Sequence, residues 1–276
     1  MKHIKLCVFI TIIVIALSAC GAHADGVKIG MLVPSKLVAG ASDKPQDISN
    51  LVLWSLFRPG HGADEASFKF YNNLPTMLMA LNSGEIDELS ASQPLAEYLT
   101  AVNPEFMVSC VARITGASFV FGFKAEDGTA LREKFNAALV DMRKDGTLDA
   151  LTLKYCGNHG HDKMDSVKME NFPDAPTVRV AVTGDVPPLD YVAADGEAAG
   201  FNSAILAEIG RRAKINIKLV YVETAARTTA LMSGRADAVY WYQVYKGTDE
   251  QSDAADGVIF SDPYYDTNIF IHIGRK

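Results

Sequence analysis

An alternation of strands and helices, found twice along the chain, constrains the fold more than any other feature of the sequence. In each pass a buried apolar strand is followed by a helix, a second strand, another helix and a third strand. The predicted strands are 27–33, 68–71 and 86–92 in the first pass and 178–182, 217–222 and 236–241 in the second. This order is typical of α/β units with mainly parallel sheets, so we expect two of them.

A short sequence echo marks the same place in both units. Residues 80–87 read Ala-Leu-Asn-Ser-Gly-Glu-Ile-Asp, and residues 230–237 read Ala-Leu-Met-Ser-Gly-Arg-Ala-Asp. Each copy predicts a helix that ends at a glycine, because glycine accepts the left-handed conformation, and then the entry to a strand. The echo indicates two similar folding units and carries no information about function.

Length and charge limit the classes of protein. A chain of 276 residues has room for one large domain or two small ones. Its net charge is −7 and it has no basic tract, so we expect no nucleic-acid partner. No His, Cys and Asp set has nucleophile spacing, and no glycine-rich phosphate loop follows a strand. We therefore expect a protein that is not an enzyme and that needs no cofactor.

The first residues are typical of an export signal. A positive start precedes residues 6–16, an apolar run too short to span a bilayer. Two cleavage sites stay open. Residues 17–20 resemble a lipobox, which would leave a lipid-carrying Cys20 at the new N-terminus, whereas residues 22–24 resemble an ordinary Ala-x-Ala site. Either site predicts a periplasmic protein, and the first adds a lipid anchor to the membrane.

Two cysteines, Cys110 and Cys156, lie well beyond the signal. Cys7 leaves with the signal, and Cys20 is lipidated or removed. In an oxidising compartment Cys110 and Cys156 can form a disulfide, and two buried free thiols are the alternative. Both interpretations stay open at this point.

The second unit carries several motifs in a recognisable order. The strand Val178–Ala181 is followed by Asp185–Tyr191, Gly200–Asn202, Ser233–Ala238 and Phe260–Tyr265. This order resembles the start of the extracellular solute-binding proteins of family 3, receptors that serve polar amino-acid transport. The resemblance implies an α/β, two-lobed type II periplasmic binding protein fold. It also implies that the protein delivers a solute to the permease of an ABC-type transporter.

The first unit resembles the later part of the same family. The matching segments are Val27–Gly30, Ser83–Asp87, Gln93–Tyr98, Gly122–Lys124 and Asp145–Gly157. Each half of one receptor therefore occurs once, with the second half first. We interpret this as a circular permutation, and a tandem pair of truncated domains is the alternative. Swapped order is tolerable where the old ends can be bridged at the surface.

The swapped order divides the chain into five segments. They are a signal peptide at 1–24 with the lipobox at 17–20, lobe 2 at 26–110, a hinge crossing plus the C-terminal helices of lobe 1 at 111–157, a polar linker at 158–176, and lobe 1 with the second hinge strand at 177–276. We expect the chain to cross between the lobes at 110–120 and 264–273. Strands 27–33 and 178–182 in one sheet would refute the swapped order.

The resemblance also implies how an amino acid would be held, and this sequence departs from that pattern. In the family an aromatic residue stacks on the ligand, a Gly-x-Thr stretch and an Arg hold its carboxylate, and an Asp binds its ammonium. Here the aromatic position is Leu189, the Gly-x-Thr stretch is the bulky run 240–244, the Arg has no counterpart, and the Asp aligns with Ser92. Because two charge-assisted contacts are missing, we expect a small polar solute other than an ordinary α-amino acid.

Candidate ligand-binding residues follow the carboxyl ends of strands, where open α/β sheets place their sites. The candidates are Asp185, Asp190, Tyr191, Arg227, Trp241 and Tyr242 in lobe 1, and Ser35, Ser90, Ser92 and Gln93 in lobe 2. Arg227 would anchor an anion, and Trp241 or Tyr242 would form a stacking wall. The alternatives are a solvated helix position for Arg227, core packing for the aromatic residues and turn chemistry for Asp185.

Two other functions stay open. A sensory module that reports a solute to a signalling partner needs the same cleft. An enzyme on this scaffold, as in some dehydratases, would need a cleft carboxylate with a raised pKa, and Asp185, Asp190 and Glu223 are the nearby acids. His159, His161 and Asp162 do not predict a metal site, because a flexible linker holds no fixed geometry. We expect a monomer.

Overall fold

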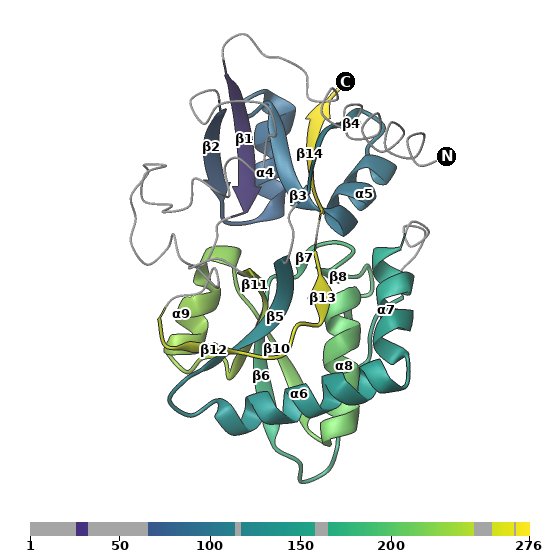
Figure 1. Cartoon of the computed structure of the whole chain (residues 1–276), viewed down its shortest axis with the longest axis vertical. Coiled ribbons are helices and arrows are strands. Elements are labelled where there is room, and N and C mark those ends of the chain that lie inside the picture. The colour runs from purple at the N-terminus through teal and green to yellow at the C-terminus, as the bar shows by residue number, and fades with distance from the viewer. Residues whose placement is uncertain (1–25, 33–65, 114–116, 158–164, 246–255, 268) are drawn as a thin grey trace, which may run out of the picture.

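The computed structural model describes residues 26–32, 66–113, 117–157, 165–245, 256–267 and 269–276. Two α/β lobes, each built on its own main sheet, are stacked along the long axis of the molecule (Figure 1). The strands that begin at Val27 and Thr177 lie in different sheets. The arrangement that would refute the swapped order is therefore absent from the described part of the chain.

Lobe 2, the upper lobe in Figure 1, is built on a five-stranded sheet. In spatial order its strands are β2 (Ala66–Tyr71), β1 (Val27–Leu32), β3 (Glu88–Ser92), β14 (Ile269–Arg275) and β4 (Phe106–Arg113). β1 is parallel to β2 and β3, and β14 is antiparallel to β3 and β4. Helices α4 (Leu74–Ser83) and α5 (Gln93–Val102) bury their apolar faces, with Met77, Leu81, Leu95 and Leu99 in the core.

Lobe 1 is built on a six-stranded sheet. Its strands are β10 (Asn216–Tyr221), β6 (Thr177–Val182), β11 (Ala238–Tyr245), β5 (Ala117–Lys124) and β12 (Val258–Phe260) in that order, with β13 (Tyr265–Asp266) also paired to β5. Its helices are α6 (Thr129–Lys144), α7 (Thr147–Cys156), α8 (Phe201–Ala213) and α9 (Arg227–Met232), the last preceded by the 3-10 turn η3 (Thr224–Ala226). A small sheet of β7 (Asp185–Val186), β8 (Asp190–Val192) and β9 (Ala198–Ala199) was not expected from the sequence.

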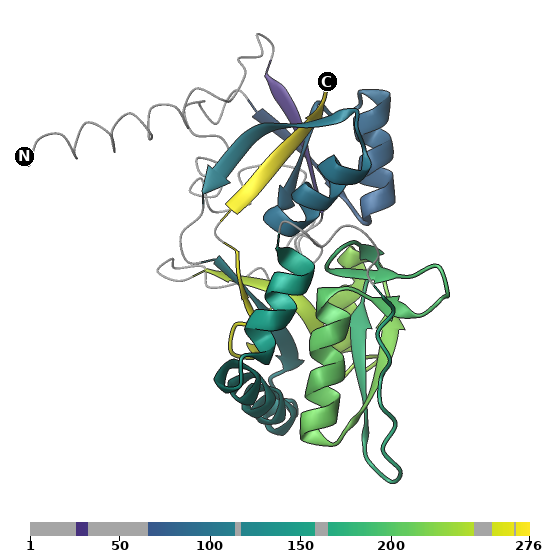
Figure 2. The ribbon, with the colours of Figure 1, turned by 90° about the vertical axis from the view of Figure 1, so that its right-hand side faces the viewer.

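Two segments of the chain pass between the lobes (Figure 2). β4 in the lobe 2 sheet leads to β5 in the lobe 1 sheet, and β13 in lobe 1 leads back to β14 in lobe 2. These segments overlap the ranges 110–120 and 264–273. The extended run expected at 264–273 is two strands rather than one, because β13 pairs with β5 whereas β14 pairs with β3 and β4.

The sequence echo has the same structural cause in both lobes. The glycine of each copy has a left-handed φ, 77° in lobe 2 and 72° in lobe 1. Asp87 Oδ2 then accepts a hydrogen bond from the Lys28 N–H at 2.8 Å, and Asp237 Oδ2 accepts one from the Arg179 N–H at 2.8 Å. Each aspartate N–H donates back to the carbonyl of the same partner. The repeated motif thus ties the entry of one strand to the first strand of its lobe.

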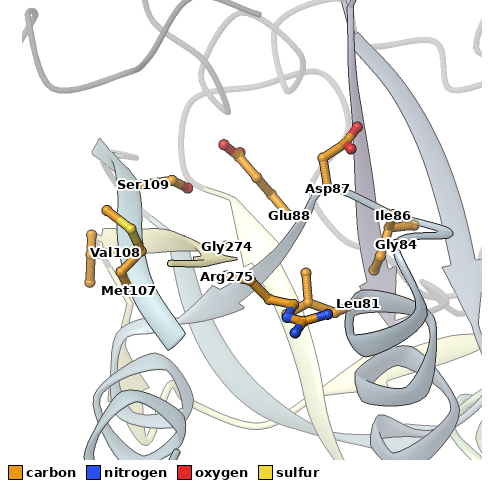
Figure 3. A pocket seen from close by; sticks show the side chains of 10 residues that line it. All are labelled: Leu81, Gly84, Ile86, Asp87, Glu88, Met107, Val108, Ser109, Gly274 and Arg275. Atoms are coloured by element: carbon orange, nitrogen blue, oxygen red, sulfur yellow. The ribbon is translucent and has the colours of Figure 1, made fainter. Parts of the chain in front are cut away.

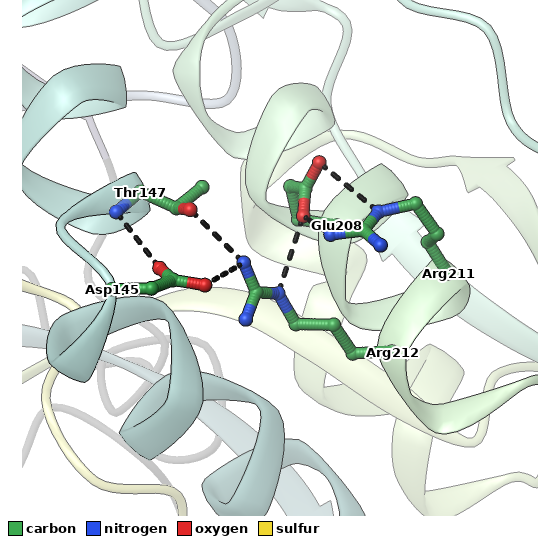
Figure 4. A network of polar contacts seen from close by, with 5 residues as sticks. All are labelled: Asp145, Thr147, Glu208, Arg211 and Arg212. Atoms are coloured by element: carbon green, nitrogen blue, oxygen red, sulfur yellow. Dashed lines mark hydrogen bonds and ion pairs between the residues drawn. The ribbon is translucent and has the colours of Figure 1, made fainter.

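A polar network joins two parts of lobe 1 that are far apart in sequence (Figure 4). Arg212 on α8 pairs with Asp145 at 2.8 Å and donates to Thr147 Oγ1 at 2.9 Å, in the turn between α6 and α7. Glu208, one turn earlier on α8, pairs with both Arg211 and Arg212. Hydrogen bonds from Thr147 and then from Arg212 lower the pKa of Asp145 to about 2. The network holds α6 and α7, the two helices of the 111–157 segment, against α8.

The later part of the predicted linker, residues 165–176, runs along lobe 1 as extended chain. The Val167 N–H donates to the Ala198 carbonyl at 2.7 Å. The Asn216 side chain accepts from the Phe172 N–H at 2.7 Å and donates to the carbonyls of Phe172 and Ala175. Val167 and Met169 also pack against the core of lobe 1. These contacts explain how a polar segment follows a defined path along the lobe. The earlier part, 158–164, lies outside the described residues.

Candidate functional site

The carboxyl ends of the parallel strands lie where the two lobes meet. β6 leads into the loop 183–191 of lobe 1, and β3 leads into α5 of lobe 2. Two hydrogen bonds cross between the lobes near this loop. The Leu74 N–H, at the start of α4, donates to Asp185 Oδ2 at 3.1 Å, and the Thr224 N–H donates to the Asn72 carbonyl at 3.0 Å. The predicted ligand residue Asp185 therefore contacts the opposite lobe directly.

Asp190 lies inside lobe 1, where 1% of its surface is exposed. Its Oδ2 accepts hydrogen bonds from the backbone N–H groups of Thr183 and Gly184 at 2.9 and 2.6 Å, and from the Tyr240 hydroxyl at 2.6 Å. Burial raises the pKa of Asp190, and these hydrogen bonds oppose the rise. The carboxylate orients the start of the 183–191 loop, and its burial favours a supporting role over direct contact with a solute.

Arg227, the first residue of α9, is 3% exposed, so the alternative of a solvated helix arginine is wrong. Its Nε donates to the Thr224 carbonyl at 3.1 Å, and its Nη1 donates to the carbonyls of Tyr240 and Trp241 at 3.1 and 2.8 Å. The guanidinium also lies 5.7 Å from the ring centre of Tyr242. Arg227 therefore holds backbone oxygens of β11.

Trp241 occupies an irregular position in β11. The register between β11 and β5 shifts between Val239 and Tyr242, and Trp241 in this bulge has a φ of 62°. A left-handed backbone conformation costs a bulky residue about 1–3 kcal/mol, and it persists only where contacts with the surrounding structure enforce it. The bulge breaks the simple alternation of faces expected for residues 240–242 and leaves the indole half-buried.

A row of aromatic rings extends from Trp241 across the strands that lead to the two crossings. Phe119 on β5 meets Trp241 edge to face, with ring centres 5.3 Å apart. Phe119 also stacks on Tyr265 of β13, directly opposite in the sheet, at 5.8 Å. The ring of Tyr240 also stacks on that of Trp241, with ring centres 6.2 Å apart. We call Trp241, Phe119 and Tyr265 the aromatic row; it places the half-buried Trp241 and Tyr265 close to the hinge.

The other two aromatic candidates have different surroundings. Tyr242 is fully buried, its hydroxyl is hydrogen bonded to Thr228 at 2.7 Å, and its ring lies 5.8 Å from that of Phe260. This position matches the core-packing alternative. Tyr191 on β8 is half-buried, and burial, followed by the nearby Tyr98 of α5, raises its pKa. Tyr191 therefore lies beside the opposite lobe.

The lobe 2 candidates gather at the end of β3. Ser90 and Ser92 are buried, and their hydroxyls form no hydrogen bond with the described residues. Ser92 immediately precedes α5 without capping it through its side chain. Gln93 donates to Glu97 Oε1 at 2.7 Å. Ser35 lies outside the described residues.

Cys110 lies in β4 of lobe 2, whereas Cys156 ends α7 of lobe 1 and is a free thiol. Of the two interpretations left open, the Cys110–Cys156 disulfide is therefore excluded. Burial raises the pKa of the Cys156 thiol. The signal segment with Cys20 and the His159–Asp162 stretch lie outside the described residues. Among the described residues no cluster of His, Cys, Asp and Glu suits a metal ion.

A pocket with a volume of about 490 Å³ lies at the far end of lobe 2 (Figure 3). It is formed by the start of β3, the end of β14 and the start of β4, and none of the predicted ligand residues lines it. Its polar groups already have partners, since Arg275 donates to the Asn82 carbonyl and Ser109 donates to the His272 carbonyl. The pocket is therefore separate from the interlobe site.

Several residues of the site were missed by the sequence prediction. Tyr240 and Thr183 complete the Asp190 network, and Phe119 and Tyr265 complete the aromatic row. The Tyr-Trp-Tyr run was a usable signal for the bulge, because three bulky aromatic residues in sequence fit a regular half-buried strand poorly. No local signal marks Phe119, which lies in an ordinary apolar strand.

A comparison with protein-family models decides the relationship of lobe 1. Residues 178–274 match the model of bacterial extracellular solute-binding proteins, family 3. The similarity to that family covers this segment of the chain. The resemblance indicated by the motifs of the second unit is confirmed over these residues. The structure confirms the expected α/β class with two lobes. No helix of the described residues is long and apolar enough to cross a membrane.

Solved structures with low sequence identity resemble most of the chain. A periplasmic binding protein from Brucella ovis with glutathione bound has 13% identity and a TM-score of 0.45, over 91% of this chain and 63% of that one. The ligand-binding component of an ABC-type import system from Staphylococcus aureus, with zinc bound, has 14% identity and a TM-score of 0.43, over 91% and 66%. Prephenate dehydratase from Arthrobacter aurescens has 13% identity and a TM-score of 0.38, over 91% and 60%. No curated protein sequence matches the chain.

Proposed function

We propose that this protein is an exported receptor that binds a small polar solute between its two lobes and delivers it to an ABC-type transporter. The match of residues 178–274 to a solute-binding family carries this proposal. The two crossings between the lobes support it, because lobes joined by two strands can close on a ligand by hinge motion. The hydrogen bonds between Asp185 and Leu74 and between Thr224 and Asn72 would stabilise the closed form.

The side chains at the junction favour a solute other than an ordinary α-amino acid. Arg227 donates to three backbone carbonyls and Asp190 accepts from two N–H groups and a hydroxyl. Ser92 replaces the family's ammonium-binding aspartate with a hydroxyl. The proposed contacts are Trp241, Tyr191 and Asp185 from lobe 1 and Ser90, Ser92 and Gln93 from lobe 2. Hydroxyls, an amide and aromatic faces suit a polar solute with a flat or apolar part.

The enzyme alternative gains no support from Asp190, one of the three acids named for it. Asp190 has a raised pKa, but the carboxyl is buried and hydrogen bonded within its own lobe. An acid in that position has no route to transfer a proton to a bound molecule without rearrangement of the 183–191 loop. A sensory function would use the same interlobe site, so it differs from transport only in the partner protein. Export is part of the proposal: cleavage at the lipobox would leave a lipid anchor at Cys20, whereas cleavage at the Ala-x-Ala site would remove Cys20 with the signal.

A thermal-shift screen tests the proposal. The panel contains amino acids, carboxylates, amines, sulfonates and dipeptides, each at millimolar concentration. A ligand present at about 100 times its dissociation constant stabilises the protein by about 2.7 kcal/mol, so a true solute raises the melting temperature by several degrees. Product analysis of each hit is the control for catalysis. The proposal fails if no member of the panel shifts the melting temperature, or if a hit is chemically converted.

A further inference from the structure

The bulge at Trp241 is held from two sides by buried polar side chains. On one side Arg227 donates from Nη1 to the carbonyls of Tyr240 and Trp241, the residues that form the bulge. The same guanidinium donates from Nε to the Thr224 carbonyl, which fixes its position against η3. A planar guanidinium donates from separate nitrogens in a fixed geometry, whereas a lysine ammonium donates from a single nitrogen on a flexible stem.

On the other side Asp190 holds the side chain of the preceding residue. The Tyr240 hydroxyl donates to Asp190 Oδ2 at 2.6 Å and is within 2.8 Å of Thr183 Oγ1. Tyr240 is fully buried, and its ring stacks on that of Trp241. Backbone and side chain of residue 240 are therefore both fixed, and the next residue is left with the left-handed φ of 62°.

We infer that Arg227 and Asp190 are positioning residues that force β11 into this bulge and thereby present the Trp241 indole to the solute. The inference rests on the proposed function for the role of Trp241 and replaces the expected role of Arg227 as an anion anchor. Because Trp241 meets Phe119, and Phe119 stacks on Tyr265, the positioned indole also connects the solute site to both strands that lead to the crossings.

The test begins without any ligand, so that it is independent of the proposed function. The chain has two tryptophans, and Trp54→Phe leaves Trp241 as the only one. In this background Arg227→Ala should shift the Trp241 emission maximum to longer wavelength and increase quenching by acrylamide, because the released bulge exposes the indole. Arg179→Ala, which breaks an ion pair with Asp237 in the same lobe, is the matched control and should leave the emission unchanged.

Two milder variants keep the test decisive if Arg227→Ala does not fold. Arg227→Lys retains the positive charge but not the planar guanidinium with its separate N–H donors, and it should shift the emission maximum in the same direction as Arg227→Ala. Tyr240→Phe removes only the hydroxyl that binds Asp190, and should cause a smaller shift of the same sign. Wild-type emission in both folded variants would overturn the inference.

A second measurement uses a solute found by the thermal-shift screen. Because Arg227→Lys should release the Trp241 indole from its position, it should weaken solute binding about tenfold or more, which corresponds to about 1.4 kcal/mol or more. An emission shift without loss of affinity would support the positioning of Trp241 and contradict its role in binding. Loss of affinity with wild-type emission would instead favour the anion anchor and overturn the inference.

Discussion

At the scale of single residues, hydrogen-bonding partners decide what each charged side chain does. Asp190 and Arg227 have the chemistry of ligand-binding groups, yet both are buried and bonded to groups of their own lobe. Asp185 is less buried and reaches the opposite lobe. Residue type therefore indicates only the chemistry of a side chain, while its partners in three dimensions separate supporting residues from those that we propose contact the solute.

The lowered pKa of Asp145 predicts a defined dependence of stability on pH. Its value falls to about 2 in the folded protein, mainly through hydrogen bonds from Thr147 and then from Arg212. A carboxyl with a lowered folded pKa contributes stability above its unfolded value near 3.9 and loses it as the pH falls through the folded value. The melting temperature of Asp145→Asn should therefore differ from wild type at pH 5 and converge with it towards pH 2. A constant difference over this range would contradict the assignment.

Much of the fold follows from local sequence, and the site does not. The prediction of α4 at residues 74–83 agrees with the structure, because an apolar face and a terminal glycine define a helix within one segment. The bulge in β11 depends instead on Arg227 and Asp190, which are distant in sequence and meet the strand only after folding. The 183–191 loop is similar, since its short strands depend on pairing with β9 and on the buried Asp190.

At the scale of elements, the two copies of the glycine turn predict two equal effects. Gly84→Ala and Gly234→Ala should each destabilise the protein by about 1–2 kcal/mol, because each glycine has a positive φ that is unfavourable for alanine. An added Cβ would meet no atom within 4 Å at either position, so backbone strain is the only cost and it should be equal at both. Chemical denaturation measures both changes, with Ser83→Ala and Ser233→Ala as controls at neighbouring positions. A large cost at only one glycine would contradict a shared structural cause.

The contact between Asp185 and α4 predicts an effect on closure. Asp185→Ala removes the acceptor of the Leu74 N–H, and a hydrogen bond of this kind contributes about 1 kcal/mol. Titration calorimetry with a screened solute should show affinity weakened about fivefold, while Asp185→Asn, which keeps an acceptor oxygen, should bind nearly as wild type. Equal loss in both variants would contradict the closure role of the Leu74 contact and would indicate that the negative charge of Asp185 determines affinity through its proposed contact with the solute.

At the scale of the whole molecule, the chain ends support the swapped order that we propose. Ile29 and Gly274 pair with Glu88 from opposite sides, so β1 and β14 lie about 10 Å apart, two strand spacings. The start of β1 and the end of β14 lie at the same end of the strands, because β1 is parallel to β3 whereas β14 is antiparallel to it. A short loop could therefore join residue 276 to residue 26.

This geometry predicts that the family order can be restored. A chain that begins at residue 165, continues through a glycine and serine loop from 276 to 26, and ends at 157 should fold with wild-type circular dichroism and bind the same solute. A permutant opened inside α8 is the control and should not fold. Failure of the first permutant to fold would contradict the proposal that the lobes occur in swapped order.

The central claim is that one solute is held by both lobes, and titration calorimetry on variants of each lobe tests it most directly. A screened solute should bind with a stoichiometry of one, and both Trp241→Ala in lobe 1 and Ser92→Val in lobe 2 should weaken its affinity about tenfold or more, as expected for lost packing or a lost buried hydrogen bond. Arg275→Ala, at the pocket on the far end of lobe 2, should bind as wild type. Affinity that falls only in Arg275→Ala, or that depends on one lobe alone, would contradict the claim.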